Sequence, residues 1–201
     1  MRGQAAYGLL PVDSGEVSLP THNVSIGNPY QALQNRVAYV PKDRDGEALM
    51  MGASIQNNFC LPSVETLKGR FGFLSPKKLY QASSKAREQF SVKSTGVDQL
   101  MRALSGGNKQ KVNLGRWLIK DLDVLIVDCP TRGVDIGVKA YIYQCLREAK
   151  EKGMAILLIT DELSEVLGMA DTIAVMKDGE ICKLLPRSAE LSEETIIEVM
   201  T

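Results

Sequence analysis

The sequence predicts an α/β fold built around a parallel sheet, and three observations lead to this expectation. Residues 124–127 are an uninterrupted apolar run, as in a strand that is buried on both faces of a parallel sheet. Residues 137–152 then carry apolar side chains at helical spacing. A second short apolar run follows at 155–160. Strands that alternate with helices in this order are joined by right-handed crossovers.

The segment before this core predicts shorter elements. Gly15–Leu19 alternates after a turn signal, and Arg36–Val40 is a short β-branched run that Pro41 ends, so both are expected to be strands. Residues 64–90 are polar and favour helix, apart from a Pro-Lys-Lys break, and they indicate a small helical insertion.

The segment after the core predicts one more helix and a hairpin. Asp178-Gly179 supplies the positive φ angles of a tight turn, so the strands on either side should pair as a hairpin. The expected elements are a helix at Glu162–Met169, a strand at Thr172–Met176, a turn at Lys177–Glu180 and a strand at Ile181–Leu185.

Composition excludes several classes of protein. Lys plus Arg and Asp plus Glu number 24 each, so no basic excess is present to neutralise a nucleic-acid backbone. No apolar run approaches the roughly 20 residues that cross a bilayer, and no secretory signal is recognised, so the cytoplasm is expected. The four cysteines lack a C-x-x-C spacing and His22 is the only histidine, which leaves no set of zinc ligands.

The strongest functional pattern is Leu-Ser-Gly-Gly-Asn-Lys-Gln-Lys-Val at 104–112. Ser105 precedes two glycines at the start of a predicted helix, where backbone N–H groups and the positive end of the helix dipole favour a phosphate. Taken alone, Ser-Gly-Gly is more often a plain helix cap with a tight entry. The residues that follow favour the phosphate interpretation.

The apolar run at 124–127 ends in Asp128, at the edge where open α/β sheets bind ligands. Its carboxylate would hold magnesium, usually through water, because this cation prefers oxygen ligands and keeps several waters. An aspartate that merely ends a buried strand is the alternative. Thr131-Arg132-Gly133-Val134-Asp135 follows at once.

This ordered set of motifs, with Val-Met-Lys-Asp-Gly-Glu at 175–180, resembles ATP-binding cassettes (ABC ATPases). The form of the motifs is most similar to the C-terminal cassette of sugar importers of the ribose, galactose and xylose type, whose ATPase subunits carry two fused cassettes. The resemblance implies ATP and Mg as cofactors, and a helical subdomain at about residues 50–105 that meets membrane-spanning permease subunits. It implies that Ser105, Gly106, Gly107 and Asn108 form the signature motif, that Asp128 is the Walker B aspartate, that Asp135 is the D-loop aspartate and that Lys42 lies in the Q-loop.

The sequence departs from the family pattern at four points. No G-x-x-x-x-G-K-[ST] motif occurs in residues 1–201, which we interpret as a single cassette domain truncated at its N-terminus, with weak ATP affinity of its own. Cys129 stands where working cassettes carry the glutamate that polarises water, a role worth typically about 10² to 10⁴ in rate. Asp161 replaces the switch histidine, and its negative charge repels phosphate. Lys42 replaces the Q-loop glutamine.

These losses, beside an intact signature, predict a cassette that completes the ATP site of a partner and does not hydrolyse ATP alone. Cassettes work as head-to-tail pairs, in which one member's signature contacts the ATP held by the other's P-loop. The expected partners are a second cassette and permease subunits at the cytoplasmic face of the membrane, without insertion of this chain. A truncated cassette that serves as an interaction or regulatory module is the alternative. Cassettes of DNA repair or translation are disfavoured by the neutral charge and by the absence of coiled-coil heptads.

Overall fold

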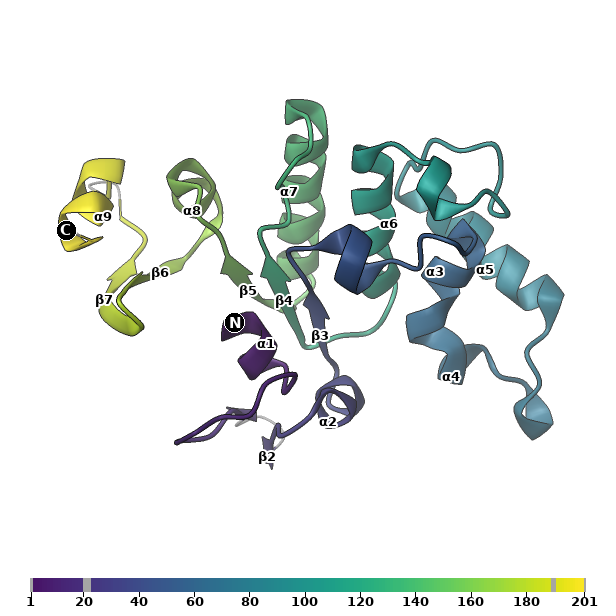
Figure 1. Ribbon diagram of the computed structural model, residues 1–201, viewed down its shortest axis with the longest axis horizontal. Helices are drawn as coiled ribbons and strands as arrows, with labels where there is room; N and C mark the ends of the chain where they lie inside the picture. The colour runs from purple at the N-terminus through teal and green to yellow at the C-terminus, as the bar shows by residue number, and fades with distance from the viewer. Residues whose placement is uncertain (1, 20–22, 189–190, 201) are drawn as a thin grey trace. The chain divides into compact units, whose positions relative to one another are not determined.

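The computed structural model describes residues 2–19, 23–188 and 191–200 (Figure 1). His22 lies outside the described residues. The chain divides into two compact units, Met1–Leu157 and Leu158–Thr201. Within the described ranges no helix is long and apolar enough to cross a membrane, and α7, at 16 residues, is the longest.

A three-stranded sheet belongs to the first unit, apart from the end of its last strand, where the second unit begins. Its strands are β3 (Val37–Val40), β4 (Val124–Asp128) and β5 (Ala155–Ile159), in the order β3-β4-β5. β3 and β4 run parallel, with Val37 opposite Val124 and Val40 opposite Val127. The apolar run at 124–127 therefore forms the parallel strand that the sequence predicts, and its pairing places the carboxyl ends of β3 and β4 at one edge.

Two long helices pack side by side beside β4 (Figure 1). These are α6 (Gly106–Leu118) and α7 (Ile136–Glu151), and both were expected from their apolar spacing. α7 buries one stripe of side chains at that spacing, which consists of Ile142, Cys145, Leu146 and Ala149. α6 buries both apolar and polar residues, because it packs on α7, on β3 and on helices of the insertion.

The N-terminal segment contains α1 (Arg2–Ala6), an antiparallel pair formed by β1 (Ser18–Leu19) and β2 (Val24–Ser25), and α2 (Pro29–Gln34). The strand predicted at Gly15–Leu19 is therefore shorter than expected. The strand predicted from Arg36 begins at Val37, because Arg36 has a left-handed backbone with φ of 61°.

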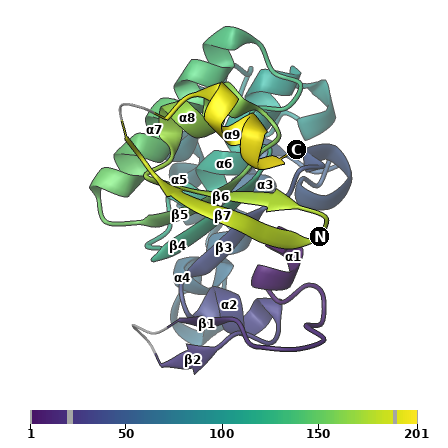
Figure 2. The same cartoon turned by 90° about the vertical axis from the view of Figure 1, so that its left-hand side faces the viewer.

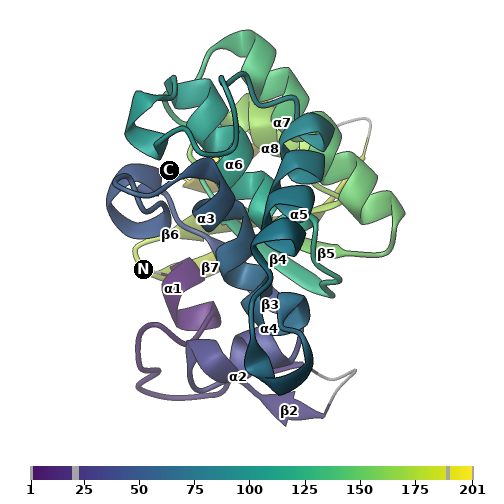
Figure 3. The same cartoon turned by 90° about the vertical axis from the view of Figure 1, so that its right-hand side faces the viewer.

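A group of helices, all of them short apart from the 14-residue α5, occupies the range in which an insertion was predicted (Figure 3). The aromatic rings of Phe59 and Phe90 lie 6.3 Å apart in its interior, beside the fully buried Ile55 and Met101. That this range acts as a separate subdomain stays a prediction. Its elements are α3 (Ile55–Cys60), η2 (Leu61–Ser63), α4 (Val64–Leu67), η3 (Arg70–Gly72), α5 (Pro76–Gln89) and η4 (Met101–Ala103), and a π-helical turn, η1 (Arg44–Ala48), precedes them.

The second unit is built on the predicted hairpin (Figure 2). β6 (Thr172–Lys177) and β7 (Glu180–Pro186) pair antiparallel, and positive φ angles at Asp178 and Gly179 form the turn. The helix expected at Glu162–Met169 is α8 (Leu163–Met169), whereas α9 (Glu193–Met200) was not predicted. A small core holds the unit together and consists of Ile173, Val175, Leu185 and Ile196.

Candidate functional site

Ser105 begins α6 as its N-cap, with an extended backbone and an exposed side chain. Its Oγ accepts hydrogen bonds from Asn108, at 3.5 Å from the backbone N and at 2.9 Å from Nδ2. Because both of these bonds use lone pairs of Oγ, the hydroxyl proton of Ser105 is left to donate elsewhere. The cap thus leaves a donor at a helix N-terminus, where the first N–H groups also lack partners within the helix.

Two neighbouring side chains lie close to the glycines that follow Ser105. A Cβ atom added at Gly106 would lie 2.9 Å from Nη2 of Arg44, and one added at Gly107 would lie 2.7 Å from Cγ2 of Val138. A side chain at either position would require Arg44 or Val138 to shift, whereas glycine at both positions leaves the backbone at the start of α6 without a side chain to cover it. This is the close approach that a phosphate needs.

An ion-pair cluster ties η1 to α6. Asp45 accepts from Nζ of Lys109 at 3.0 Å and from Nε of Arg44 at 3.2 Å. Burial raises the pKa of Asp45, but the hydrogen bond and charge of Lys109, together with Arg44, outweigh it and lower the pKa overall. The cluster holds the Arg44 guanidinium against Gly106, so a cation lies beside the start of the signature helix. Sequence reasoning missed this cluster, because 64 positions separate Asp45 from Lys109.

Both polar atoms of the Asn108 side-chain amide make hydrogen bonds within the chain. Its Nδ2 donates to Ser105, and its Oδ1 accepts from the backbone N–H of Lys93 at 2.9 Å. These contacts give Asn108 the role of orienting the Ser105 hydroxyl. Direct contact between Asn108 and a nucleotide stays a prediction.

Asp128 lies at the carboxyl end of β4, next to the ring of Tyr39 on β3. The Tyr39 hydroxyl donates to Oδ2 of Asp128 at 3.3 Å. Burial raises the pKa of Tyr39, and the charge of Asp128 raises it further, so this hydroxyl keeps its proton as the donor. The sequence did not identify Tyr39 as a partner of Asp128, because the two residues lie on different strands.

The residues around Asp128 fit magnesium only in part. Among the described residues no three His, Cys, Asp or Glu side chains group together in a way that could hold a metal ion. Magnesium in such sites takes one or two carboxylates and completes its shell with waters and substrate phosphates. Asp128 would therefore hold the ion only together with a nucleotide.

Cys129 follows Asp128 in a backbone conformation that is uncommon for a residue other than glycine, with φ of 45°. It is buried, with 7% of its surface exposed. Gln110 of α6 donates to the carbonyl oxygen of Pro130 at 2.6 Å and fixes the next residue of the loop. Left-handed conformations of this kind cost energy and gather at functional sites.

The loop from Cys129 ends at Asp135, which is the N-cap of α7 and accepts from the Val138 N–H at 3.0 Å. Within this loop the Gly133 carbonyl oxygen lies 3.8 Å from a Cβ built on Gly106. The predicted D-loop and signature are therefore neighbours. Lys42 is exposed just beyond β3, at the same sheet edge as Asp128. Asp161 belongs to the second unit, and its predicted role stays a prediction.

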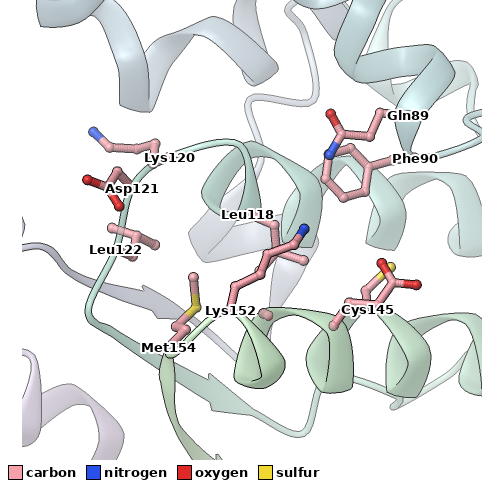
Figure 4. Close-up of a pocket in the computed structure, with 11 residues that line it drawn as sticks. Gln89, Phe90, Leu118, Lys120, Asp121, Leu122, Cys145, Lys152 and Met154 are labelled. Atoms are coloured by element: carbon pink, nitrogen blue, oxygen red, sulfur yellow. The ribbon is translucent and has the colours of Figure 1, made fainter.

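Two of the cavities among the described residues lie in the first unit. One of about 510 Å³ lies at the carboxyl end of β3, between Tyr39, Pro41, Glu47 and the buried Arg116. The other, of about 160 Å³, is shown in Figure 4 and is lined by residues such as Asp121 and Met154, which precede β4 and β5. Open α/β sheets bind ligands at the carboxyl ends of their strands, so the cavity in Figure 4 is on the wrong edge for a nucleotide.

Comparisons with known proteins identify the family of the chain. A profile of the family described as "ABC transporter" matches residues 4–132. The "Ribose import ATP-binding protein RbsA" of Lactococcus lactis subsp. lactis is 37% identical over 98% of this chain, and its counterpart in Bacillus cereus is 35% identical over the same share. The chain spans 40% of the length of each of these relatives.

Two solved structures share the fold. A nucleotide-free ATP-binding cassette from an ABC transporter matches with a TM-score of 0.78 at 21% identity, covering 98% of this chain and 81% of that one. A dimeric cassette in a post-hydrolysis state, bound to ADP and Pi, matches with a TM-score of 0.79 at 18% identity, covering 94% and 80%. With the family profile covering most of the chain, these findings establish that the chain belongs to the ABC transporter family.

Proposed function

We propose that these 201 residues act as the C-terminal ATP-binding cassette of a sugar import system and lend their signature motif to an ATP held by a second cassette. The observation that carries this proposal is the start of α6. It combines the Ser105 hydroxyl, two glycines that leave the backbone without side chains, and an Arg44 guanidinium held by Asp45. Each of these features favours the binding of an anion such as a phosphate group.

Sugar import is proposed from the names of the relatives, which are ribose import ATP-binding proteins. The chain corresponds to less than half of each relative, so the activity of the complete protein is part of the proposal. In the two-cassette arrangement, the other cassette is fused on the N-terminal side. Permease subunits bind the helices at about 50–105 and keep the assembly at the cytoplasmic face of the membrane.

The contribution of the chain to its own ATP site is proposed to be small. Asp128 can share a magnesium ion with a nucleotide, but residues 1–201 contain no P-loop sequence to cradle the phosphates. Cys129, at the position of the catalytic glutamate, supplies no carboxylate to polarise water, and Asp161 supplies a repelling charge. Hydrolysis therefore takes place at the site whose P-loop and catalytic base belong to the partner.

Magnesium-dependent ATP hydrolysis by the isolated chain tests the second half of this proposal. We expect no turnover above a protein-free blank. A turnover of about 1 per second, in the ordinary range for enzymes, that Asp128→Asn abolishes would contradict the proposal, because it would mean that this chain holds a complete site.

A further inference from the structure

Arg44 opens the π-helical turn η1 and places its guanidinium against the start of α6. Outside the adjoining chain, the two atoms nearest to a Cβ built on Gly106 are Nη2 and Cζ of Arg44, at 2.9 and 3.6 Å. The guanidinium therefore occupies the space that a side chain at Gly106 would fill, next to the Ser105 N-cap. π-Helical turns are rare and occur frequently at functional sites. This turn brings a cation from another part of the chain to the first residue of the signature helix.

Within the described part of the chain, Arg44 uses one of its three guanidinium nitrogens. Its Nε donates to Oδ1 of Asp45 at 3.2 Å. Among the described residues, Nη1 and Nη2 have no hydrogen-bond acceptor. Arginine binds a phosphate group through two parallel N–H donors, which the planar guanidinium presents in a fixed geometry. The two Nη groups of Arg44 therefore remain available for an acceptor of that kind.

Asp45 and Lys109 hold the guanidinium in place before a ligand arrives. The second carboxylate oxygen of Asp45 accepts from Nζ of Lys109 at 3.0 Å, so the arginine is linked to α6 through this acid. The side chains of Arg44 and Lys109 are only 20% and 13% exposed. A side chain that is already ordered loses little conformational freedom on binding, which favours affinity. Asp45 and Lys109 are therefore positioning residues for Arg44.

The other acidic groups near this turn have partners or face elsewhere. Asp43 directs Oδ1 to a backbone N–H of its own turn at 3.0 Å, and Glu47 lines the cavity that also contains Tyr39. Asp135 accepts from a backbone N–H at the start of α7. Residues 42–48, 105–109 and 128–135 together contain four cations, Lys42, Arg44, Lys109 and Arg132, and five anions, Asp43, Asp45, Glu47, Asp128 and Asp135. Net charge therefore does not attract an anion to this place, and selection depends on directed donors such as the Nη groups of Arg44.

We propose that Arg44 is a specificity-determining residue of the shared ATP site, and that its two Nη groups bind the terminal phosphate of the ATP held by the partner cassette. This inference rests on the proposed function, because it requires the signature of this chain to face that ATP. ADP ends one phosphate earlier and leaves the guanidinium without an acceptor. Arg44 therefore makes the shared site favour a nucleoside triphosphate over a diphosphate.

Equilibrium binding to the assembled transporter measures this preference. A non-hydrolysable ATP analogue and ADP each displace a fluorescent ADP derivative in the presence of magnesium, and their two dissociation constants are compared. Arg44→Gln should weaken binding of the analogue at least about tenfold, as expected for lost charge-assisted hydrogen bonds, and should leave the dissociation constant of ADP unchanged. Arg187→Gln removes an arginine from an exposed position just beyond β7 and should change neither constant.

Arg44→Lys is the second variant, because lysine keeps the charge beside Asp45 but lacks the planar pair of donors. Its dissociation constant for the analogue should lie between those of the parent and of Arg44→Gln. Thermal unfolding of each variant is recorded in parallel. If Arg44→Gln lowers the stability of the cassette, the comparison of the analogue with ADP is made with Arg44→Lys.

Equal binding of the analogue by the parent and Arg44→Gln would overturn the proposal. Equal losses for the analogue and ADP would also overturn it, because they would give Arg44 a structural role. Ser105→Asp separates this inference from the proposed function. If Ser105→Asp weakens binding of the analogue and Arg44→Gln does not, only the role of Arg44 is wrong. If neither variant weakens it, the proposed function is wrong as well.

Discussion

Replacing Gly107 by alanine tests whether the signature glycine is fixed by packing as well as by function. A Cβ atom at this position would lie 2.7 Å from Cγ2 of Val138, and a β-branched side chain on a helix has little freedom to rotate away. Overpacking of this kind costs about 1–3 kcal/mol, while replacing glycine by alanine in a helix gains up to about 1 kcal/mol. We therefore expect Gly107→Ala to destabilise the first unit by about 1 kcal/mol.

In a Val138→Ala background the same change should raise the free energy of unfolding instead of lowering it, because the obstructing methyl group is absent. There Gly107→Ala is expected to stabilise by up to about 1 kcal/mol through helix propensity alone. The assay is urea unfolding of the four proteins of this cycle, followed by the fluorescence of Trp117 at the other end of α6. An identical effect of Gly107→Ala in both backgrounds would refute the packing argument.

Two further predictions concern Asp45 and Cys129. Asp45→Asn should lower the free energy of unfolding at pH 7 by a few tenths to about 1 kcal/mol, a small value because the carboxylate is 45% exposed. The pKa of Asp45 is lowered in the folded state, so its stabilisation is present above the unfolded pKa of about 4 and is lost as the pH falls through the folded pKa. Urea unfolding over a series of pH values below 7 should thus show the difference between parent and variant shrinking once the pH falls below the unfolded pKa, and a difference that stays constant with pH would contradict the ion-pair account. Cys129→Glu should not restore ATP hydrolysis to the isolated chain, because a base with no positioned phosphate has nothing to act on, and measurable turnover in a phosphate-release assay would show that unrecognised residues cradle the nucleotide.

Most of the first unit could be predicted because its signals are local. The apolar run of β4, the spacing of α7 and the Ser105 cap each depend on residues within one element. The errors arose where the backbone conformation of a single residue determines where an element begins. Arg36 has a left-handed backbone, so β3 begins one residue later than predicted.

The motifs of the candidate site could be predicted from the sequence, whereas the contacts that their residues make could not. Glycine was expected at 106 and 107 for the approach of a phosphate, but the groups that exclude a side chain there, Arg44 and Val138, lie far away in sequence. Tyr39 and Asp128 are 89 positions apart, and their hydrogen bond depends on the register of β3 with β4. Contacts of this kind follow from tertiary packing, which no window of sequence contains.

The central claim, that this chain lends its signature to the ATP of a partner, is tested most directly by Ser105→Asp in the assembled transporter. Aspartate caps helices as well as serine does, and its charge is favourable at a helix N-terminus, so the fold should be kept. The same charge would face the phosphate of the partner's ATP and repel it. Ser105→Asn is the matched control, with a similar shape, a capping oxygen and no charge.

The measurement is the rate of ATP hydrolysis by the transporter that carries each variant, with the thermal stability of each cassette recorded beside it. The account predicts that Ser105→Asp loses at least about tenfold in rate, corresponding to a charge-assisted hydrogen bond of about 1.5–3 kcal/mol, at unchanged stability, while Ser105→Asn retains most of the activity. Parental turnover with Ser105→Asp in place would contradict it, and the signature of this chain would then serve only to start α6.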